Sequence, residues 1–291
     1  MQLVLHAGAH ITDEDRLLKC LTANKPMLAE RGTEVPYPKT YRRLLRDILH
    51  AAVQTGIADD TREVLMDALC FDEAPGRLIL SNPGFFGTPK MAASGGDFYT
   101  AAAGRTQIFR DIFARDDIEL FFAICNPATF LPAIMAQTKF DSLPTYLGRT
   151  DPREMRWSGM IEQVRSAIPD IPITIWCNED TPLIWGQILR EMAGIEPGVP
   201  LTGEYALLRE IMTPTGMTRF ESYLKQHPGM TEMQKRRVIS AFLDKFADED
   251  AIEEELDLPG WTDDMVNELT DLYDEDVYRI GRIPGITLID P

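Results

Sequence analysis

Near the N-terminus the chain carries the run Gln2-Leu3-Val4-Leu5-His6-Ala7-Gly8-Ala9-His10-Ile11-Thr12-Asp13-Glu14-Asp15-Arg16. Its first five residues predict a buried β-strand, and the small residues that follow predict a turn. Residues 13–31 carry leucines at helical spacing, so we expect a helix there that Pro26 breaks or restarts. A strand, a small-residue turn and a helix in this order are typical of the first unit of an α/β protein.

Short apolar runs alternate with amphipathic stretches along the first two-thirds of the chain. We expect strands at residues 77–81, 118–125, 171–176 and 286–289, and helices at residues 37–55, 61–69, 107–113, 158–168 and 183–193. This order predicts a central parallel sheet with helices on both faces. Residues 84–104 are rich in Gly, Ala and Ser and predict a long loop, either a surface loop or a lid.

Charge is distributed unevenly along the chain. The 291 residues include 29 Lys and Arg against 46 Asp and Glu, a net charge of −17, and residues 244–276 alone hold 15 acidic residues and one basic residue. We expect a single domain over residues 1–291, with residues 201–291 a mainly helical, acidic subregion. The acidity argues against a nucleic-acid partner. We expect the acidic region to be a solvated surface, and a basic partner is the alternative.

The sequence shows no targeting signal and no metal-binding or redox motif of paired cysteines. The N-terminal run has no basic region, and the longest apolar run, residues 120–125, is far below the roughly 20 residues of a membrane span. We therefore expect a cytoplasmic protein with no membrane partner. The cysteines, which form no CxxC pair, predict reduced and mostly buried thiols; they are Cys20, Cys70, Cys125 and Cys177.

Three motifs carry a resemblance to a known family. A Walker loop and a dinucleotide GxGxxG are both absent, but the first turn keeps His6, Gly8, His10 and Thr12 in the spacing of a His-x-Gly-x-His/Pro-Lys-Thr-Gly-Thr-Thr motif. Residues 121–127 are similar to a second motif, a buried strand ending in Arg-Asn/Asp-Pro. Residues 272–286 resemble a closing helix and strand. In these places the chain resembles the bacterial sulfotransferase-like P-loop proteins.

The resemblance implies a P-loop NTPase-like sheet of the sulfotransferase type, with a mostly helical C-terminal part, and PAPS as the sulfate donor. It places Gly8, His10, Thr12 and Asn126 at the donor, and His10 is the candidate catalytic base or charge partner. Arg105 joins these candidates because it follows the Gly-rich segment 84–104, whose N–H groups could cradle an anion. Lys90 and Arg149 are further candidate cations.

Several donor contacts of the family are replaced in this chain. The Lys position is Ile11, and the Gly-Thr-Thr positions are Asp13-Glu14-Asp15. The Arg and Ser that hold the donor's ribose phosphate are Cys125 and Ala133. Charged hydrogen bonds are worth roughly 1.5–3 kcal/mol each, so their loss removes about 5 kcal/mol or more of binding free energy.

We therefore expect a sulfotransferase-like protein with a degenerate PAPS site that acts as a non-catalytic binding or interaction protein. The alternative is an active PAPS-dependent sulfotransferase that transfers sulfate to a hydroxyl or amine acceptor. A third hypothesis is a cation site at Asp13, Glu14 and Asp15, although no further metal-ligand motif accompanies them. Our structural expectation is that these acids cap the first helical turn.

The remaining polar and aromatic candidates have structural interpretations. His6 and His10 are expected to be satisfied structural histidines. Trp176 and Trp185 are expected in the core. Residues 149–157 carry three arginines and Trp157, and predict either a solvated helix start or a lip that contacts an acceptor or partner.

Overall fold

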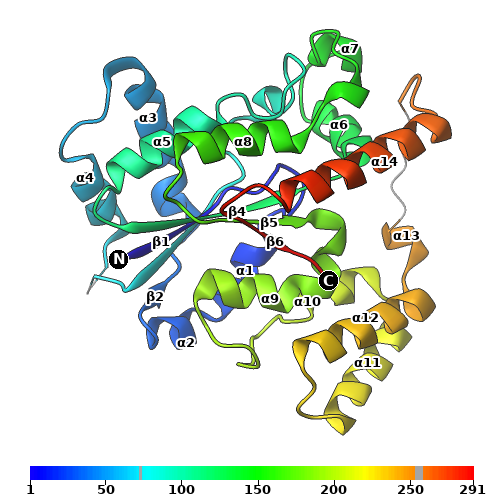
Figure 1. Cartoon of the computed structure of the whole chain (residues 1–291). Coiled ribbons are helices and arrows are strands. Elements are labelled where there is room, and N and C mark those ends of the chain that lie inside the picture. The colour runs from blue at the N-terminus through cyan, green and yellow to red at the C-terminus, as the bar shows by residue number, and fades with distance from the viewer. Residues whose placement is uncertain (72–73, 253–257) are drawn as a thin grey trace.

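A single six-stranded sheet forms the centre of the molecule (Figure 1). The structure is a computed structural model that describes residues 1–71, 74–252 and 258–291. The strands pair in parallel in the order β2-β3-β1-β4-β5-β6. Their bounds are β1 Gln2–His6, β2 Thr33–Glu34, β3 Arg77–Ser81, β4 Asp117–Ile124, β5 Ile173–Cys177 and β6 Ile286–Ile289. The predicted parallel α/β architecture is confirmed.

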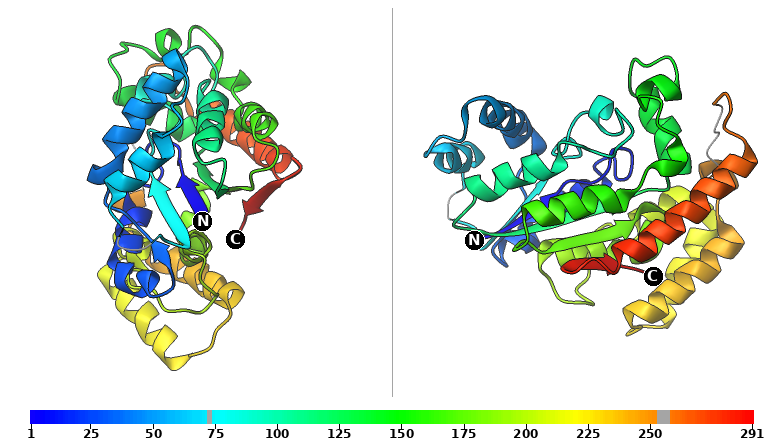
Figure 2. Two further views of the ribbon diagram at one scale, coloured as in Figure 1. Left: turned by 90° about the vertical axis from the view of Figure 1, so that its left-hand side faces the viewer. Right: turned by 45° about the horizontal axis from the view of Figure 1, so that its top comes forward.

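Successive side chains of β1 point to opposite faces of the sheet, and the core therefore has two layers. Leu3 and Leu5 point to one face, and Val4 points to the other, as successive residues of a strand must. Both faces are covered by helices, so the strand residues are apolar almost without interruption. The two helical layers, one on each side of the sheet, can be followed in Figures 1 and 2.

The first face of the sheet carries most of the helices. They are α3 Pro38–Thr55, α4 Thr61–Leu69, α5 Ala102–Ile112, α6 Pro127–Ala136, α7 Leu143–Tyr146, α8 Trp157–Ala167 and α14 Asp263–Ile280. The second face is covered by α1 Arg16–Ala23, α2 Lys25–Ala29 and α9 Thr181–Ala193, with α10 Ala206–Ile211 beside them. Every strand predicted from the sequence is present in the sheet, whereas the short edge strand β2 is an addition.

The described residues of the C-terminal third are mainly helical, and β6 is the last element of the chain. Helices α11 Pro214–Gln226 and α12 Glu232–Phe246 form a hairpin with its own small core around Phe220. Two backbone hydrogen bonds close this hairpin at its base, from Thr213 N to Phe246 O and from Asp248 N to Ile211 O, both 2.9 Å. The short α13 Glu249–Ile252 follows, and α14 and β6 then return to the main body. Part of the acidic stretch 244–276, residues 253–257, lies outside the described ranges.

The first helix begins later than predicted. Glu14 and Asp15 have φ angles of +49° and +63°, so they lie in the left-handed region and cannot belong to a right-handed helix. Helix α1 therefore starts at Arg16, and the expectation that the three acids occupy its first turn is wrong. Only Asp13 caps the helix, because its carboxylate accepts a hydrogen bond of 2.7 Å from the Leu17 N–H. The predicted break is confirmed, since α1 ends before Asn24 and Pro26 lies at the start of α2.

The Gly-rich segment 84–104 is anchored in the core. It contains a 3-10 turn at Pro89–Met91, and α5 begins inside it at Ala102. Phe98 is 2% exposed and stacks on the fully buried Trp157, with 3.8 Å between ring centroids. The predicted long loop is therefore present but buries its aromatic residues, and Trp157 belongs to the core and not to a lip.

No helix within the described ranges is long and apolar enough to cross a bilayer.

Replacing Phe98 tests this anchoring. Phe98→Ala removes a buried ring and leaves a cavity against Trp157, so we expect the free energy of unfolding to fall by about 3–5 kcal/mol. Urea denaturation measures the loss. The control is Val53→Ala on α3, where the side chain is 71% exposed and the expected change is within about 0.5 kcal/mol. Equal effects of the two substitutions would contradict an anchored segment.

Candidate functional site

The order of the strands places a ligand-binding crevice at one position along the sheet edge. From β1 the chain moves to β2 on one side, whereas from β4 it moves to β5 on the other side. Because β1 and β4 are neighbours, their outgoing connections diverge at their carboxyl ends. Such a topological switch point is where open α/β sheets bind ligands.

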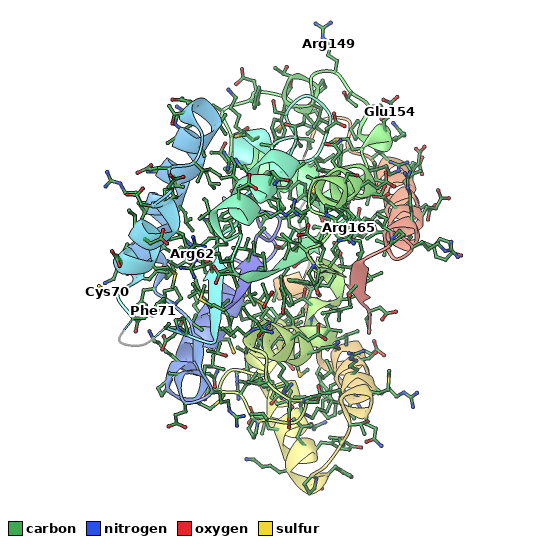
Figure 3. All side chains as sticks on the ribbon, turned by 60° about the vertical axis from the view of Figure 1, so that its left-hand side comes forward. Arg62, Cys70, Phe71, Arg149, Glu154 and Arg165 are labelled. Carbon is green, nitrogen blue, oxygen red and sulfur yellow. The ribbon has the colours of Figure 1, made fainter. Side chains whose placement is uncertain are left out.

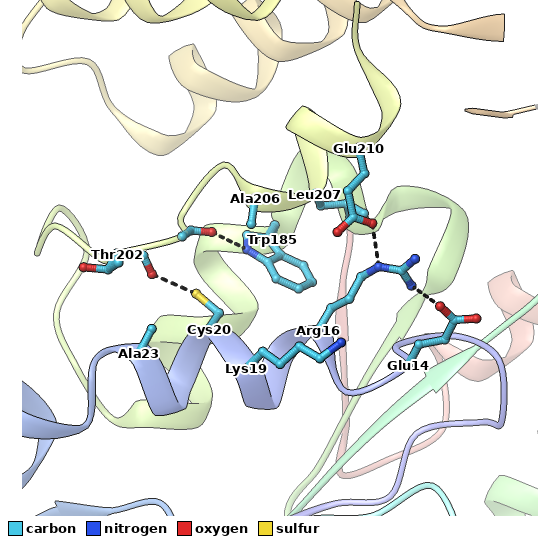
Figure 4. A pocket seen from close by; sticks show the side chains of 11 residues that line it. Glu14, Arg16, Lys19, Cys20, Ala23, Trp185, Thr202, Ala206, Leu207 and Glu210 are labelled. Atoms are coloured by element: carbon cyan, nitrogen blue, oxygen red, sulfur yellow. Dashed lines mark hydrogen bonds and ion pairs between the residues drawn. The ribbon is translucent and has the colours of Figure 1, made fainter. Parts of the chain in front are cut away.

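A cleft of about 940 Å³ lies at this switch point. The loops after β1, β4 and β5 line it together with residues of α1, α6, α9, α10, α12 and α13. Its polar lining residues are Thr12, Glu14, Arg16, Cys125, Asn126, Thr129, Asn178, Glu179, Thr181 and Glu210. A smaller pocket of about 350 Å³ adjoins it and shares five lining residues with it, Glu14, Arg16, Trp185, Leu207 and Glu210 (Figure 4).

The loop after β1 is held in a strained conformation. Ile11 has a φ of +64°, a left-handed conformation that costs a β-branched residue roughly 1–2 kcal/mol. Gly8 also has a positive φ, of +48°, and a side chain there would meet the ring of His6. The Thr12 hydroxyl donates to the Ala9 carbonyl over 2.8 Å and so closes the turn. Backbone strain of this kind is typical of functional loops.

The three acids of this loop point to three different partners. Asp13 caps α1, and burial raises the pKa of its carboxyl. Asp15 pairs with Arg42 of α3, and that guanidinium lowers the pKa of Asp15. Glu14 pairs with Arg16 over 3.1 Å. The acids therefore do not form a common cation site, and no group of three metal-ligating side chains gathers anywhere in the described ranges.

The cation in the cleft is held by carboxylates. Arg16 is the one Lys or Arg among the described residues that line it, and its guanidinium pairs with Glu14 and, over 2.7 Å, with Glu210 of α10 (Figure 4). Glu14 contacts Nη1 of this guanidinium and Glu210 contacts Nε. The positive charge that a bound anion would need is therefore compensated within the protein.

The end of β5 forms a negative pole of the cleft. Glu179 accepts hydrogen bonds from Asn126 N–H at 2.7 Å and from the Tyr273 hydroxyl at 3.0 Å, but no Lys or Arg of the described chain lies within ion-pair distance of it. Burial, followed by the charge of Glu179, raises the pKa of the neighbouring Asp180. Net negative potential at this end of the cleft follows from these uncompensated carboxylates.

Thr181 adds a buried hydroxyl without a partner. It is 6% exposed at the start of α9, it lines the cleft, and its Oγ1 makes no hydrogen bond to any described residue. Leaving a buried polar group unsatisfied costs about 1–3 kcal/mol. Thr181 lines the cleft, but its Oγ1 is itself closed to solvent, so a molecule in the cleft reaches the hydroxyl only after the side chain rotates.

The structure brings only some of the predicted donor residues to the cleft. Thr12 and Asn126 line it, and Asn126 caps α6 by accepting from the Ala128 N–H. Gly8 lies at the base of the β1 loop. Arg105 lies on α5, half-buried and outside the cleft lining, where it donates to the carbonyls of Gly84 and Phe85 and where burial lowers its pKa.

His10 is placed behind the loop and not in the cleft lining. Its Nδ1 lies 2.7 Å from the hydroxyl of the buried Tyr99, and its backbone N–H donates to the same oxygen. Burial lowers the pKa of His10 to about 4, so its ring is neutral at pH 7. His6 is likewise buried, with Nδ1 at 2.9 Å from the Ser81 hydroxyl. Both histidines have structural contacts, although His6 Nε2 has no partner among the described residues.

The further cations are spread over the molecular surface. Lys90 lines a separate pocket near Phe140, and Arg149 points away from the body of the molecule (Figure 3). Arg153, from the same arginine-rich segment, pairs with Glu268 of α14 over 2.7 Å. These residues therefore do not assemble with the loop after β1.

Sequence reasoning did not propose Glu179, Thr181, Trp185 or Glu210 as site residues. Glu179 and Thr181 directly follow a predicted strand. That position at a strand end was the only sequence feature that could have indicated them as site residues. Trp185 was expected in the core, where it is 4% exposed, yet it also lines the cleft. Glu210 comes from a helix distant in sequence, and no local pattern indicates its pairing with Arg16.

Comparison with models of protein families finds no match, and comparison with curated proteins finds none either.

The buried His10 ring predicts a pH dependence of stability. In the unfolded chain the ring takes up a proton near pH 6.5, whereas in the folded protein it does so only near pH 4. The unfolded state therefore binds more protons between these values, and stability falls as the pH is lowered. Between pH 7 and pH 5 we expect His10 to account for a loss of about 2 kcal/mol.

His10→Gln isolates this contribution, because glutamine does not titrate and can still hydrogen-bond to Tyr99. Urea denaturation at pH 7 and pH 5 measures the change for both proteins. The wild type should lose about 2 kcal/mol more than the variant. Equal losses would mean that His10 is not held neutral by the fold.

Proposed function

We propose that this protein is a sulfotransferase-like P-loop protein whose donor site does not hold PAPS as the family does, and that it acts as a non-catalytic binding protein. The strand, turn and helix at residues 2–23 support the assignment, because they stand at the switch point of a parallel sheet. That is where the resemblance puts the donor. The cleft beside this turn is the proposed binding site.

The compensated charge of Arg16 is the observation that carries the proposal. The charged groups lining the cleft are three carboxylates and one guanidinium, and two of the carboxylates pair with that guanidinium. A phosphosulfate donor would meet a guanidinium whose charge is already shared between Glu14 and Glu210. It would also approach Glu179, a like charge on an exposed residue, and that repulsion is strongest at low ionic strength.

The other donor positions add to this barrier. Ile11, at the Lys position, offers no charge and packs against the hydrophobic core. Cys125 and Ala133 stand at the family's Arg and Ser positions, and neither side chain can make a charge-assisted contact with a phosphate. A loss of about 5 kcal/mol takes a micromolar dissociation constant to the millimolar range or beyond.

Binding of adenosine 3′,5′-bisphosphate tests the proposal directly. We expect no binding heat and no change in melting temperature with about 1 mM of this nucleotide, because the site lacks the charge to hold it. PAPS should behave in the same way, and labelled sulfate should not reach hydroxyl or amine acceptors. Tight stoichiometric binding with sulfate transfer would instead establish the active sulfotransferase.

Freeing Arg16 tests whether its carboxylate partners are the barrier. The double variant Glu14→Gln/Glu210→Gln removes both charges and leaves Arg16 in place, so we expect the nucleotide's dissociation constant to fall by about tenfold or more. The control is Asp271→Asn/Glu275→Gln, which makes the same change of net charge on the exposed side of α14. If the two double variants bind the nucleotide equally, local compensation of Arg16 is not the cause.

A further inference from the structure

The cleft has apolar lining residues as well as carboxylates. Trp185 of α9, Leu207 and Ile211 of α10 and Leu243 of α12 line it, together with Pro182. A volume of about 940 Å³ is enough for a small organic molecule. An apolar wall combined with a few polar groups is the usual composition of such sites. The wall indicates that part of the ligand is apolar.

The polar end of the cleft favours a positive charge. Glu179 is fixed by two neutral donors, the Asn126 N–H and the Tyr273 hydroxyl, and no cation among the described residues neutralises it. The Thr181 hydroxyl lies buried two residues further along the chain and lacks a partner. An ammonium group supplies both missing partners. Its positive charge neutralises the Glu179 carboxylate, and its N–H groups can donate to the Thr181 oxygen.

A divalent metal ion does not fit this set of residues. Such ions take six or more oxygen ligands, often from several carboxylates. In the described part of the chain no three His, Cys, Asp or Glu side chains gather in a suitable arrangement. A single positive charge on an organic molecule needs only one carboxylate and a hydroxyl.

We propose that the cleft binds an organic cation with an apolar body, such as an alkyl- or arylalkylamine. Its ammonium group pairs with Glu179 and, once the Thr181 side chain rotates toward the cleft, with that hydroxyl, and its apolar body lies along the wall that contains Trp185. The inference rests on the proposed function to the extent that it takes the cleft as the binding site. It adds the chemical class of the ligand, which the resemblance to sulfotransferases does not provide.

Three matched probes test the charge requirement. They are 4-phenylbutylamine, the neutral 4-phenylbutan-1-ol and the anionic 5-phenylpentanoate, and calorimetry with the full chain measures each. We expect the amine to bind about tenfold or more tightly than the other two, because only the amine can pair with Glu179. Equal binding of amine and alcohol, tighter binding of the carboxylate, or no binding of the amine would overturn the proposal.

Two variants locate the ammonium group. Glu179→Gln removes the charge and should reduce the affinity for the amine about tenfold while leaving that for the alcohol unchanged. Thr181→Val removes a hydroxyl that has no partner, so the protein should keep or gain thermal stability and still lose affinity for the amine. If Thr181 had only a structural role, its replacement would not lower the affinity for the amine while leaving thermal stability intact. Unchanged affinity in both variants would overturn the placement.

Thr106→Val serves as the control for Thr181→Val. Thr106 is also buried, but its hydroxyl donates to the Ala102 carbonyl over 2.7 Å on α5, outside the cleft lining. This variant should lose stability and keep its affinity for the amine. The amine measurements are independent of the nucleotide measurements. A protein that binds the nucleotide would contradict the proposed function, whereas one that binds neither molecule would contradict only the ligand class.

Discussion

The position of β1 between β3 and β4 is the constraint from which the site follows. Ladders on both sides bury β1 completely from Leu3 to His6, and the loop after β1 starts at the carboxyl edge of the sheet beside the ends of β3 and β4. The loop that leaves there is forced between the turns that follow β3 and β4. Its strained residues, of which Ile11 is the clearest, are tolerated because the surrounding sheet and helices determine their path. A cleft at this edge is therefore a consequence of the strand order.

Charge compensation then determines what the cleft can hold. Arg42 and Arg16 neutralise two of the three acids in the loop, and Asp13 is used to cap α1. The loop that would be strongly anionic from its sequence is thus close to neutral in the fold. The uncompensated charge lies instead at the end of β5, on Glu179 and its neighbour Asp180. The uncompensated negative charge of the cleft therefore comes from the end of β5 and not from the loop after β1.

Much of the fold could be predicted because its signals are local. The apolar runs at β1, β4 and β5 can satisfy burial on both faces only as strands in a parallel sheet, and Pro26 marks the break between two helices. The start of α1 was predicted wrongly because acids favour helix starts on average, whereas here left-handed residues precede Arg16. The site was less accessible to sequence reasoning. The pairing of Arg16 with Glu210 joins residues 194 positions apart, and no periodic pattern encodes such a contact.

The two backbone hydrogen bonds at the base of the α11–α12 hairpin have an architectural consequence. They clamp the point at which the chain enters the hairpin to the point at which it leaves, at Ile211–Thr213 and Phe246–Asp248. A hairpin whose two ends are hydrogen-bonded to each other can be lengthened, shortened or replaced without displacing those ends. Changes at the tip of the hairpin therefore leave the positions of α14 and β6 in the fold unchanged. Changes near its base alter the lining of the cleft through Leu243.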